Sequence, residues 1–244
     1  MSRKIQIFEG FPQEAFDFLS ELSRNNNKDW FDAHRGVYDT AIVQPALLFV
    51  ESMGIAFKAM TPSVKAEPRI GGSLFRIHRD VRFSADKSPH KTHVGMRFRD
   101  RDTITSSRCT GPLFYVEFDA QALRLGVGVK EFDSRTLAAY RDLVAGVDGS
   151  PLDRALLTDM VRLAAIRGHE ILGPVLSRLP KGYPTDANPD LLARKGLFIR
   201  SEAEIPHEMK RSEFISYCSG WFRPYVPLFE SLRNVALSTF IATP

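Results

Sequence analysis

The residues best suited to chemistry are gathered between Arg76 and His93, a segment that we call the basic loop. Its arginine forks and lysine amines are the groups that bind phosphate or carboxylate oxygens. Serine and threonine hydroxyls lie between them, and the Gly71-Gly72 pair before the segment allows a sharp turn of the backbone. The candidate anion-binding residues are Arg76, Arg79, Arg82, Lys87 and Lys91.

The positive charge of the chain is concentrated in this region. Between Arg76 and Asp102 there are eight Lys or Arg residues and four Asp residues, an excess equal to the net charge of +4 of all 244 residues. The rest of the chain is therefore neutral overall. A local excess of this kind indicates an anionic partner more strongly than a basic isoelectric point does.

Two acids of the basic loop, Asp80 and Asp86, are the candidate catalytic residues, either as a general base or as groups that orient the cations. A structural alternative is that these acids pair with Arg79 and Arg82 and hold a long loop in place, since ion-pair networks are common in folded proteins. Replacing Arg82 and Lys87 by alanine distinguishes the two interpretations. An anion site would lose its ligand without unfolding, whereas a structural network would unfold.

Metal binding is a weaker interpretation of the same segment. His90 and His93 are three residues apart, and Asp86 precedes His90 by four. Two histidines and a carboxylate can form an open metal site, but this spacing matches no strong zinc signature. We predict no metal site. The sequence contains no phosphate-binding loop, dinucleotide fingerprint or nucleophile elbow, so it leaves the cofactor unknown.

Nucleic-acid binding is the third interpretation, because Phe75, Phe83 and Phe98 are interspersed among the cations and bases could stack on them. The alternation of the sequence instead indicates that these rings point into the core. The charge excess is also small beside that of dedicated nucleic-acid-binding proteins. Exposure of Phe83 would favour an interaction module, and its burial under a basic pocket would favour an enzyme.

The elements that must position the basic loop are helices on either side of strands. Residues 1–62 show helical spacing, residues 73–130 are mainly strands, and residues 134–244 are mainly helical. Asn25–Asn27 can cap a helix, and Ser134 can cap another. This order predicts one α+β domain over residues 1–244, with a largely antiparallel sheet packed by N-terminal and C-terminal helices. The expected strands are Ser73–Ile77, Val94–Phe98, Leu113–Phe118, Leu123–Val129 and Gly196–Ser201.

One of these strands, Leu123–Val129, is apolar on one face and carries Arg124, Gly126 and Gly128 on the other. A face nearly bare of side chains lets another backbone or a ligand come close.

The composition indicates a cytoplasmic globular protein. No apolar run approaches the length of a membrane span, and the N-terminal residues lack the apolar core of a secretory signal. Cys109 and Cys218 are far apart and show no ligand spacing, which favours a reducing compartment. The 18 Phe residues are an unusually large aromatic load and must be mostly buried.

Two long motifs carry a resemblance to a known family. Gly10–Leu19 with Asn25–Phe31, and then Arg79–His93, resemble the start and the central signature of a bacterial family of conserved hypothetical proteins, domain of unknown function 2461. The similarity extends over essentially the whole chain. It implies a cytosolic, single-domain α+β protein and no established activity. This sequence departs from the family pattern at His34 and His90, which counts against either histidine as a shared catalytic group.

The function that these observations favour is an anion-binding domain, and one form that it could take is an enzyme acting on a phosphorylated or carboxylated small molecule. The alternative is a non-enzymatic interaction module whose basic loop binds nucleic acid or an acidic protein. Ionic strength separates them, because binding by the module should weaken steeply with salt. We expect no membrane partner, and the sequence defines no oligomeric state.

Overall fold

The computed structural model describes residues 7–82, 84–104, 111–147, 151–184 and 187–241. In this part of the chain, six strands form one antiparallel sheet in the order β1-β2-β3-β4-β6-β5, with helices before and after it. The predicted α+β class is confirmed. The strands are β1 Val64–Lys65, β2 Val94–Asp100, β3 Leu113–Phe118, β4 Ala122–Val129, β5 Glu170–Leu172 and β6 Leu197–Glu204.

The chain divides into two compact units. The first comprises the chain up to Phe98 together with Tyr115–Leu125 and Glu202–Trp221, and the second comprises Arg99–Phe114, Gly126–Ser201 and the chain from Phe222. Four of the five boundaries fall within strands of the sheet, so each unit holds part of it. The prediction of one domain over residues 1–244 stays a prediction, and the two units are described separately.

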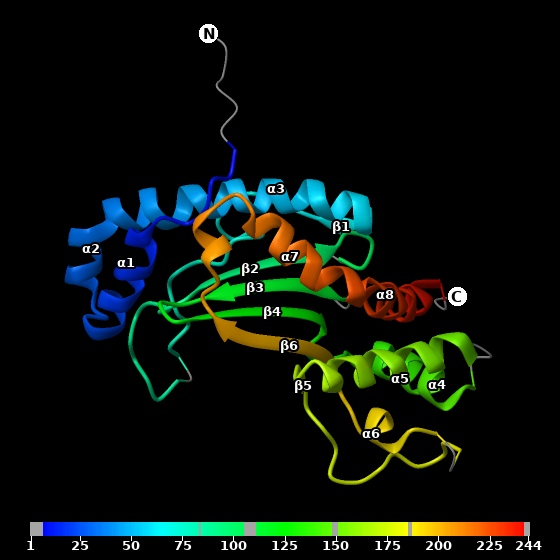
Figure 1. Ribbon diagram of the computed structural model, residues 1–244. Coiled ribbons are helices and arrows are strands. Elements are labelled where there is room, and N and C mark those ends of the chain that lie inside the picture. The colour runs from blue at the N-terminus through cyan, green and yellow to red at the C-terminus, as the bar shows by residue number, and fades with distance from the viewer. Residues whose placement is uncertain (1–6, 83, 105–110, 148–150, 185–186, 242–244) are drawn as a thin grey trace. The chain divides into compact units, whose positions relative to one another are not determined.

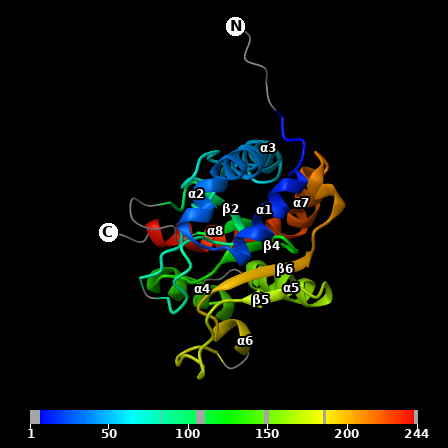
Figure 2. The ribbon, with the colours of Figure 1, turned by 90° about the vertical axis from the view of Figure 1, so that its left-hand side faces the viewer.

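Helices of the first unit lie on one face of its strands (Figure 1), and in Figure 2 the long helix α3 is seen nearly end-on with α1 and α2 beside it. Phenylalanine rings pack in the interior of this unit. The ring centroids of Phe11 and Phe118 are 4.6 Å apart, and those of Phe57 and Phe98 are 4.9 Å apart. The predicted burial of the aromatic load is thus confirmed for these rings. The helical elements of this unit are α1 Gln13–Arg24, α2 Lys28–Val37, η1 Tyr38–Val43, α3 Gln44–Met60, η2 His207–Lys210 and α7 Phe214–Phe222.

Helices α2 and α3 are continuous through the π-helical segment η1. The combined helix of 33 residues, Lys28–Met60, is long and apolar enough to cross a membrane by length and composition alone. The expectation that no stretch approaches that length is therefore too strong. Its apolar residues Phe49, Val50 and Phe57 are fully buried within the protein.

The cap predicted for α2 is present. The side chain of Asn27 accepts a hydrogen bond of 2.9 Å from the backbone N–H of Trp30, so it satisfies one of the free donors of the first turn. We expect Asn27→Ala to lower the free energy of unfolding by about 1 kcal/mol. Urea denaturation measures this loss, and Asn27→Ser, which keeps the capping oxygen, should remain close to wild type.

The prediction of a regular strand over Ser73–Ile77 is wrong. The segment makes two backbone bonds to β2, from Phe75 N to Gly95 O and from Arg97 N to Ser73 O, both 2.9 Å, and forms isolated bridges only. Gly71, with a φ of 80°, makes a left-handed turn just before this segment. The edge position is taken instead by the two-residue strand β1.

The second unit contains three longer helices. The predicted cap of the first is off by one residue, because Asp133 and not Ser134 precedes the helix and accepts the N–H groups of Arg135 and Thr136 at 2.9 Å. The helical elements of the second unit are α4 Ser134–Ala145, α5 Pro151–Ile166, α6 Pro189–Leu192, η3 Arg223–Tyr225 and α8 Val226–Ile241.

The glycine-bearing face of β4 is filled by the neighbouring strand β6. A Cβ atom at Gly126 would lie 2.5 Å from the Phe198 ring, and one at Gly128 would lie 2.1 Å from the Leu197 carbonyl oxygen. Gly128 also has a φ of 128°, which only glycine adopts readily. The two glycines therefore serve close packing of the protein itself.

Candidate functional site

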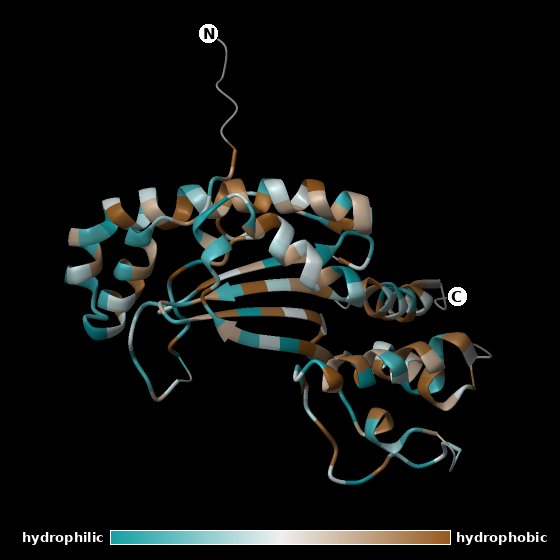
Figure 3. Cartoon of the chain, viewed as in Figure 1, coloured by the Kyte–Doolittle hydropathy of each residue, from teal (hydrophilic) through white to brown (hydrophobic). Residues whose placement is uncertain are grey.

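The first unit has charged and aromatic side chains on the sheet face opposite its core. Strands carry alternating hydrophobic and hydrophilic residues (Figure 3), and in β3 Val116 and Phe118 are fully buried whereas Tyr115 and Glu117 point to the other face. We call the group on this face the sheet cluster. Its members are His93, Tyr115, Glu117, Asp119, Arg124 and Glu202.

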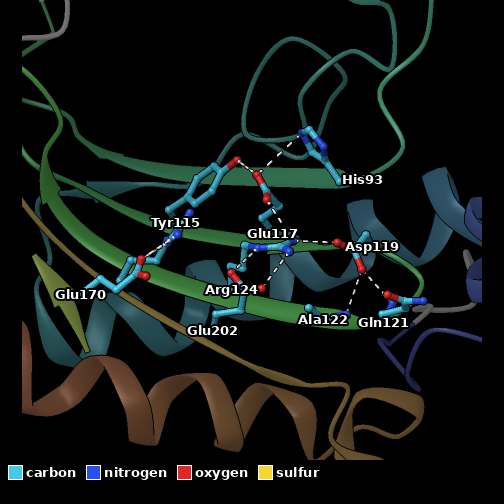
Figure 4. Close-up of polar contacts among 10 residues, drawn as sticks. His93, Tyr115, Glu117, Asp119, Gln121, Ala122, Arg124, Glu170 and Glu202 are labelled. Atoms are coloured by element: carbon cyan, nitrogen blue, oxygen red, sulfur yellow. Dashed lines mark hydrogen bonds and ion pairs between the residues drawn. The ribbon is translucent and has the colours of Figure 1, made fainter. Parts of the chain in front are cut away.

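Arg124 joins the acids of the sheet cluster (Figure 4). Its Nη1 lies 2.8 Å from Asp119 Oδ2 and 3.4 Å from Glu117 Oε1. Its Nε and Nη2 donate to the two oxygens of Glu202 at 3.0 and 3.1 Å. The Arg124 side chain is 18% exposed. Burial opposes the charge, but Glu202 and Asp119 together raise the pKa of the guanidinium, so the arginine is a fixed positive centre.

Glu117 connects this arginine to two groups that can exchange protons. Its Oε2 accepts a hydrogen bond of 2.5 Å from the Tyr115 hydroxyl and lies 3.7 Å from His93 Nε2. Burial lowers the pKa of His93, and the nearby Glu117 opposes that effect. His93 is therefore neutral at neutral pH and has a carboxylate beside it, an arrangement suited to accepting a proton.

A second group of residues surrounds the ring of Phe75, and we call it the Phe75 cluster. Lys91 Nζ lies 5.1 Å and the guanidinium carbon of Arg97 lies 4.7 Å from the ring centroid, as in cation–π pairs. Lys91 Nζ also donates to the carbonyl oxygen of Arg76 at 2.9 Å. Burial and then Arg97 lower the pKa of Lys91. Two cations thus share one ring, and the amine is partly withdrawn from water.

Arg76 is the neighbouring member of the predicted anion-binding set. It is exposed, and its guanidinium makes no hydrogen bond or ion pair with the part of the chain that the structure describes. Its position next to Phe75 in sequence, and the bond from Lys91 to its carbonyl, bring it to the Phe75 cluster.

The other predicted cations bind partners within the basic loop. Arg79 forms an ion pair with Asp86, Arg82 donates from Nε and Nη2 to the two oxygens of Asp80 at 2.9 and 2.7 Å, and Lys87 Nζ donates to the Val81 carbonyl at 3.0 Å. These contacts favour the structural interpretation for Arg79, Arg82 and Lys87. Their role in anion binding stays a prediction. The exposure of Phe83, which was to separate an interaction module from an enzyme, cannot be scored, because Phe83 lies outside the described residues. Cys109 lies outside them as well.

The two predicted catalytic acids are exposed. Hydrogen bonds from Arg82 lower the pKa of Asp80, and bonds from Ser88 and then Arg79 lower that of Asp86. A carboxylate with a lowered pKa is a weaker base at neutral pH. The structure gives neither acid a feature that favours proton transfer, and their catalytic role remains a prediction.

The fold separates His90 from His93, whereas it places His78 beside His90, with ring centroids 5.1 Å apart. His90 is 2% exposed and stacks on Phe31 with ring centroids 4.2 Å apart, while the Asn26 side chain binds its backbone N–H and carbonyl. His93 instead contacts Glu117. Among the described residues, no group of three His, Cys, Asp or Glu side chains is placed to hold a metal ion.

Reasoning from the sequence missed most of the sheet cluster. Two of its acids, Glu117 and Asp119, and its arginine are spread over a hairpin, and its third acid, Glu202, lies on β6, whereas local charge density reports only residues close in the chain. The available signal was Glu117, a charged residue inside the otherwise apolar strand Leu113–Phe118. An acid in such a strand indicates a charged partner on a neighbouring strand.

The fold and the site together define an α+β protein with a charged sheet face beside a basic loop. The chain belongs to the DUF2461 family of conserved hypothetical proteins, whose model matches residues 14–230. The resemblance found in the sequence is thereby confirmed. Comparison with curated proteins finds no match.

Proposed function

We propose that this protein binds a phosphorylated or carboxylated small molecule at the Phe75 cluster, through Lys91, Arg97 and the adjacent Arg76. The observation that carries the proposal is the meeting of Lys91 and Arg97 at one aromatic ring. Burial and the nearby Arg97 lower the pKa of Lys91, and Glu117 opposes them, so the protonated amine is unfavourable in the free protein. A bound anion would offset this cost at Lys91, because it pairs with the amine and replaces the lost water contacts.

The proposal keeps Lys91 and Arg76 from the basic loop and adds Arg97 from β2. It gives Arg79, Arg82 and Lys87 the task of shaping the loop, since each has a partner there. Arg97 donates from Nε to the Gly72 carbonyl at 3.4 Å, which orients its guanidinium beside Phe75.

If the protein is an enzyme, His93 is the residue that we propose as its general base. His93 Nε2 lies 3.7 Å from Glu117 in the sheet cluster, and Lys91 of the anion site precedes His93 by two residues in the chain. Tyr115 fixes Glu117 through its hydroxyl, and Glu117 would stabilise the imidazolium that forms on proton transfer. We further propose a cytoplasmic location, where Cys218 remains a buried thiol.

Calorimetric titration at two ionic strengths tests the proposal. Inorganic phosphate, citrate and a short single-stranded DNA are titrated at about 50 and about 300 mM salt. A small anion held by two or three cations should lose affinity by about tenfold or less, whereas a DNA strand bound along several phosphates should lose orders of magnitude. Binding of DNA alone, with a steep loss in salt, would instead support the interaction module.

A further inference from the structure

The basic loop is closed at its base by the pairing of its two ends. His78 and His90 form an antiparallel bridge. Across it, the backbone N–H groups of Arg79 and Lys91 donate to carbonyl oxygens of the facing segment at 2.9 and 2.7 Å. We call the two paired segments, residues 77–79 and residues 89–91, the strap. Lys91 of the proposed anion site therefore belongs to the strap, and its Nζ donates to the carbonyl oxygen of the residue that precedes the other segment.

His90 attaches the strap to the helices of the first unit. Its imidazole is buried and stacks on the Phe31 ring of α2, with centroids 4.2 Å apart. Asn26, in the turn between α1 and α2, donates to the His90 carbonyl at 2.9 Å and accepts from its backbone N–H at 3.1 Å. A single residue of the strap thus provides both a ring contact and two backbone bonds to the helices.

This position suits a neutral imidazole. Nδ1 of His90 is buried and makes no hydrogen bond with the part of the chain that the structure describes. Protonation places a hydrogen on both ring nitrogens, so Nδ1 would become a buried donor of a charged group without an acceptor. A buried charge that is neither paired nor hydrogen-bonded is strongly unfavourable. Protonated His90 should therefore leave its place on Phe31.

The surroundings of His90 determine the pH range in which this happens. The charged or titratable groups that act on it are His78 from the facing segment of the strap and Asp32 from α2, while Asn26 is uncharged. Burial and then His78 lower the pKa of His90, and Asp32 opposes them. The closed strap is thus fully stable above the unfolded pKa of about 6.5, and it loses stability as the pH falls from there through the lowered pKa of the folded state.

We propose that protonation of His90 opens the strap and thereby weakens the proposed anion site. When the imidazolium moves into water, the bridge to His78 opens, and Lys91 loses its bonds to the facing segment. The weakening of anion binding rests on the proposed function, whereas the opening of the strap does not. The expected direction is distinctive, because a histidine that gains a proton near an anion site otherwise strengthens it by adding positive charge.

Amide hydrogen exchange followed by NMR, and calorimetric titration with sulfate, test this inference at about pH 7.5 and about pH 5.5. Sulfate keeps its charge over this range. In the wild-type protein, the protection of the Arg79 and Lys91 amides, corrected for intrinsic exchange rates, should be lower at the acid pH by about threefold or more. Sulfate affinity should fall by about twofold or more. His90→Phe keeps a ring against Phe31 but cannot be protonated, so neither quantity should fall.

Two further variants complete the test. His78→Gln leaves His90 in place but removes a group that lowers its pKa, so the loss of protection in acid should be smaller than in the wild type. His207→Gln is the matched control, because His207 is exposed on η2 and pairs with Glu208, and it should behave as the wild type.

The two measurements separate the strap from the anion site. Protection that is the same at both pH values in the wild type, or that falls equally in His90→Phe, overturns the strap whether or not sulfate binds. Protection that falls as expected in a protein that binds no sulfate at either pH supports the strap and overturns the proposed anion site. Protection that falls while sulfate affinity stays constant or rises overturns the link between the two.

Discussion

Replacing Lys91 by methionine is expected to weaken phosphate binding by about 10- to 100-fold, the contribution of one charge-assisted hydrogen bond. The fold should remain as stable as the wild type or become slightly more stable. Methionine keeps an apolar stem against Phe75, and water can replace the bond to the exposed residue Arg76. Calorimetric titration and thermal unfolding measure the two effects on the same samples.

The expected stability follows from the direction of the pKa shift of Lys91. Because burial and Arg97 lower this pKa below its unfolded value, the protonated amine costs the folded state free energy at neutral pH. That cost persists below the folded pKa and is relieved as the pH rises through it toward the unfolded value of about 10.4. Any gain in stability from Lys91→Met should therefore shrink on the alkaline side.

Variants of two further lysines are needed to interpret this result. Lys58→Met, on the exposed face of α3, is the matched control and should change neither phosphate affinity nor thermal stability. Lys87→Met separates the anion site at Phe75 from the site expected at the tip of the basic loop. A large loss of binding in Lys87→Met would restore the sequence-based site, and a Lys91→Met protein that binds phosphate normally would refute ours.

The sequence predicted the fold through patterns that are local. Helical spacing around Phe16 and Leu19, the Asn27 cap and the alternation in β3 are each set by residues close in the chain. The continuous helix through η1 and the loss of a strand at Ser73–Ile77 depend on tertiary packing. The two-residue strand β1 and the three-residue strand β5 are too short to show a period.

The candidate site was predictable only where its residues are near in sequence. Charge density identified Lys91 and Arg76, but it could not separate them from Arg82, whose carboxylate partner is two residues away. Arg97 and Glu117 gained their roles from strand pairing, which places residues from distant positions on one face. The spacing of residues in the sequence does not reveal which face of the sheet a segment such as the basic loop will cover.

Arg124→Met is expected to destabilise the protein by about 2–3 kcal/mol, because three carboxylates lose their shared cation. Two of them, Glu117 and Asp119, have side chains only 18% and 28% exposed, so water compensates them incompletely. For a protein of this size the loss corresponds to a fall in melting temperature of about 4–10 °C. Thermal and urea unfolding measure it, with Arg211→Met, an exposed arginine, as the matched control.

The same variant should also change the titration of His93. Arg124 lowers the pKa of His93, while Glu117 and Asp119 raise it. Removing the arginine leaves the two acids, so the pKa of His93 should rise, which NMR of the imidazole signals can follow. Arg124→Lys retains a charge but loses the fork that reaches three acids, and it should fall between wild type and Arg124→Met. An unchanged His93 titration in a destabilised Arg124→Met protein would show that the arginine supports the sheet without influencing the histidine.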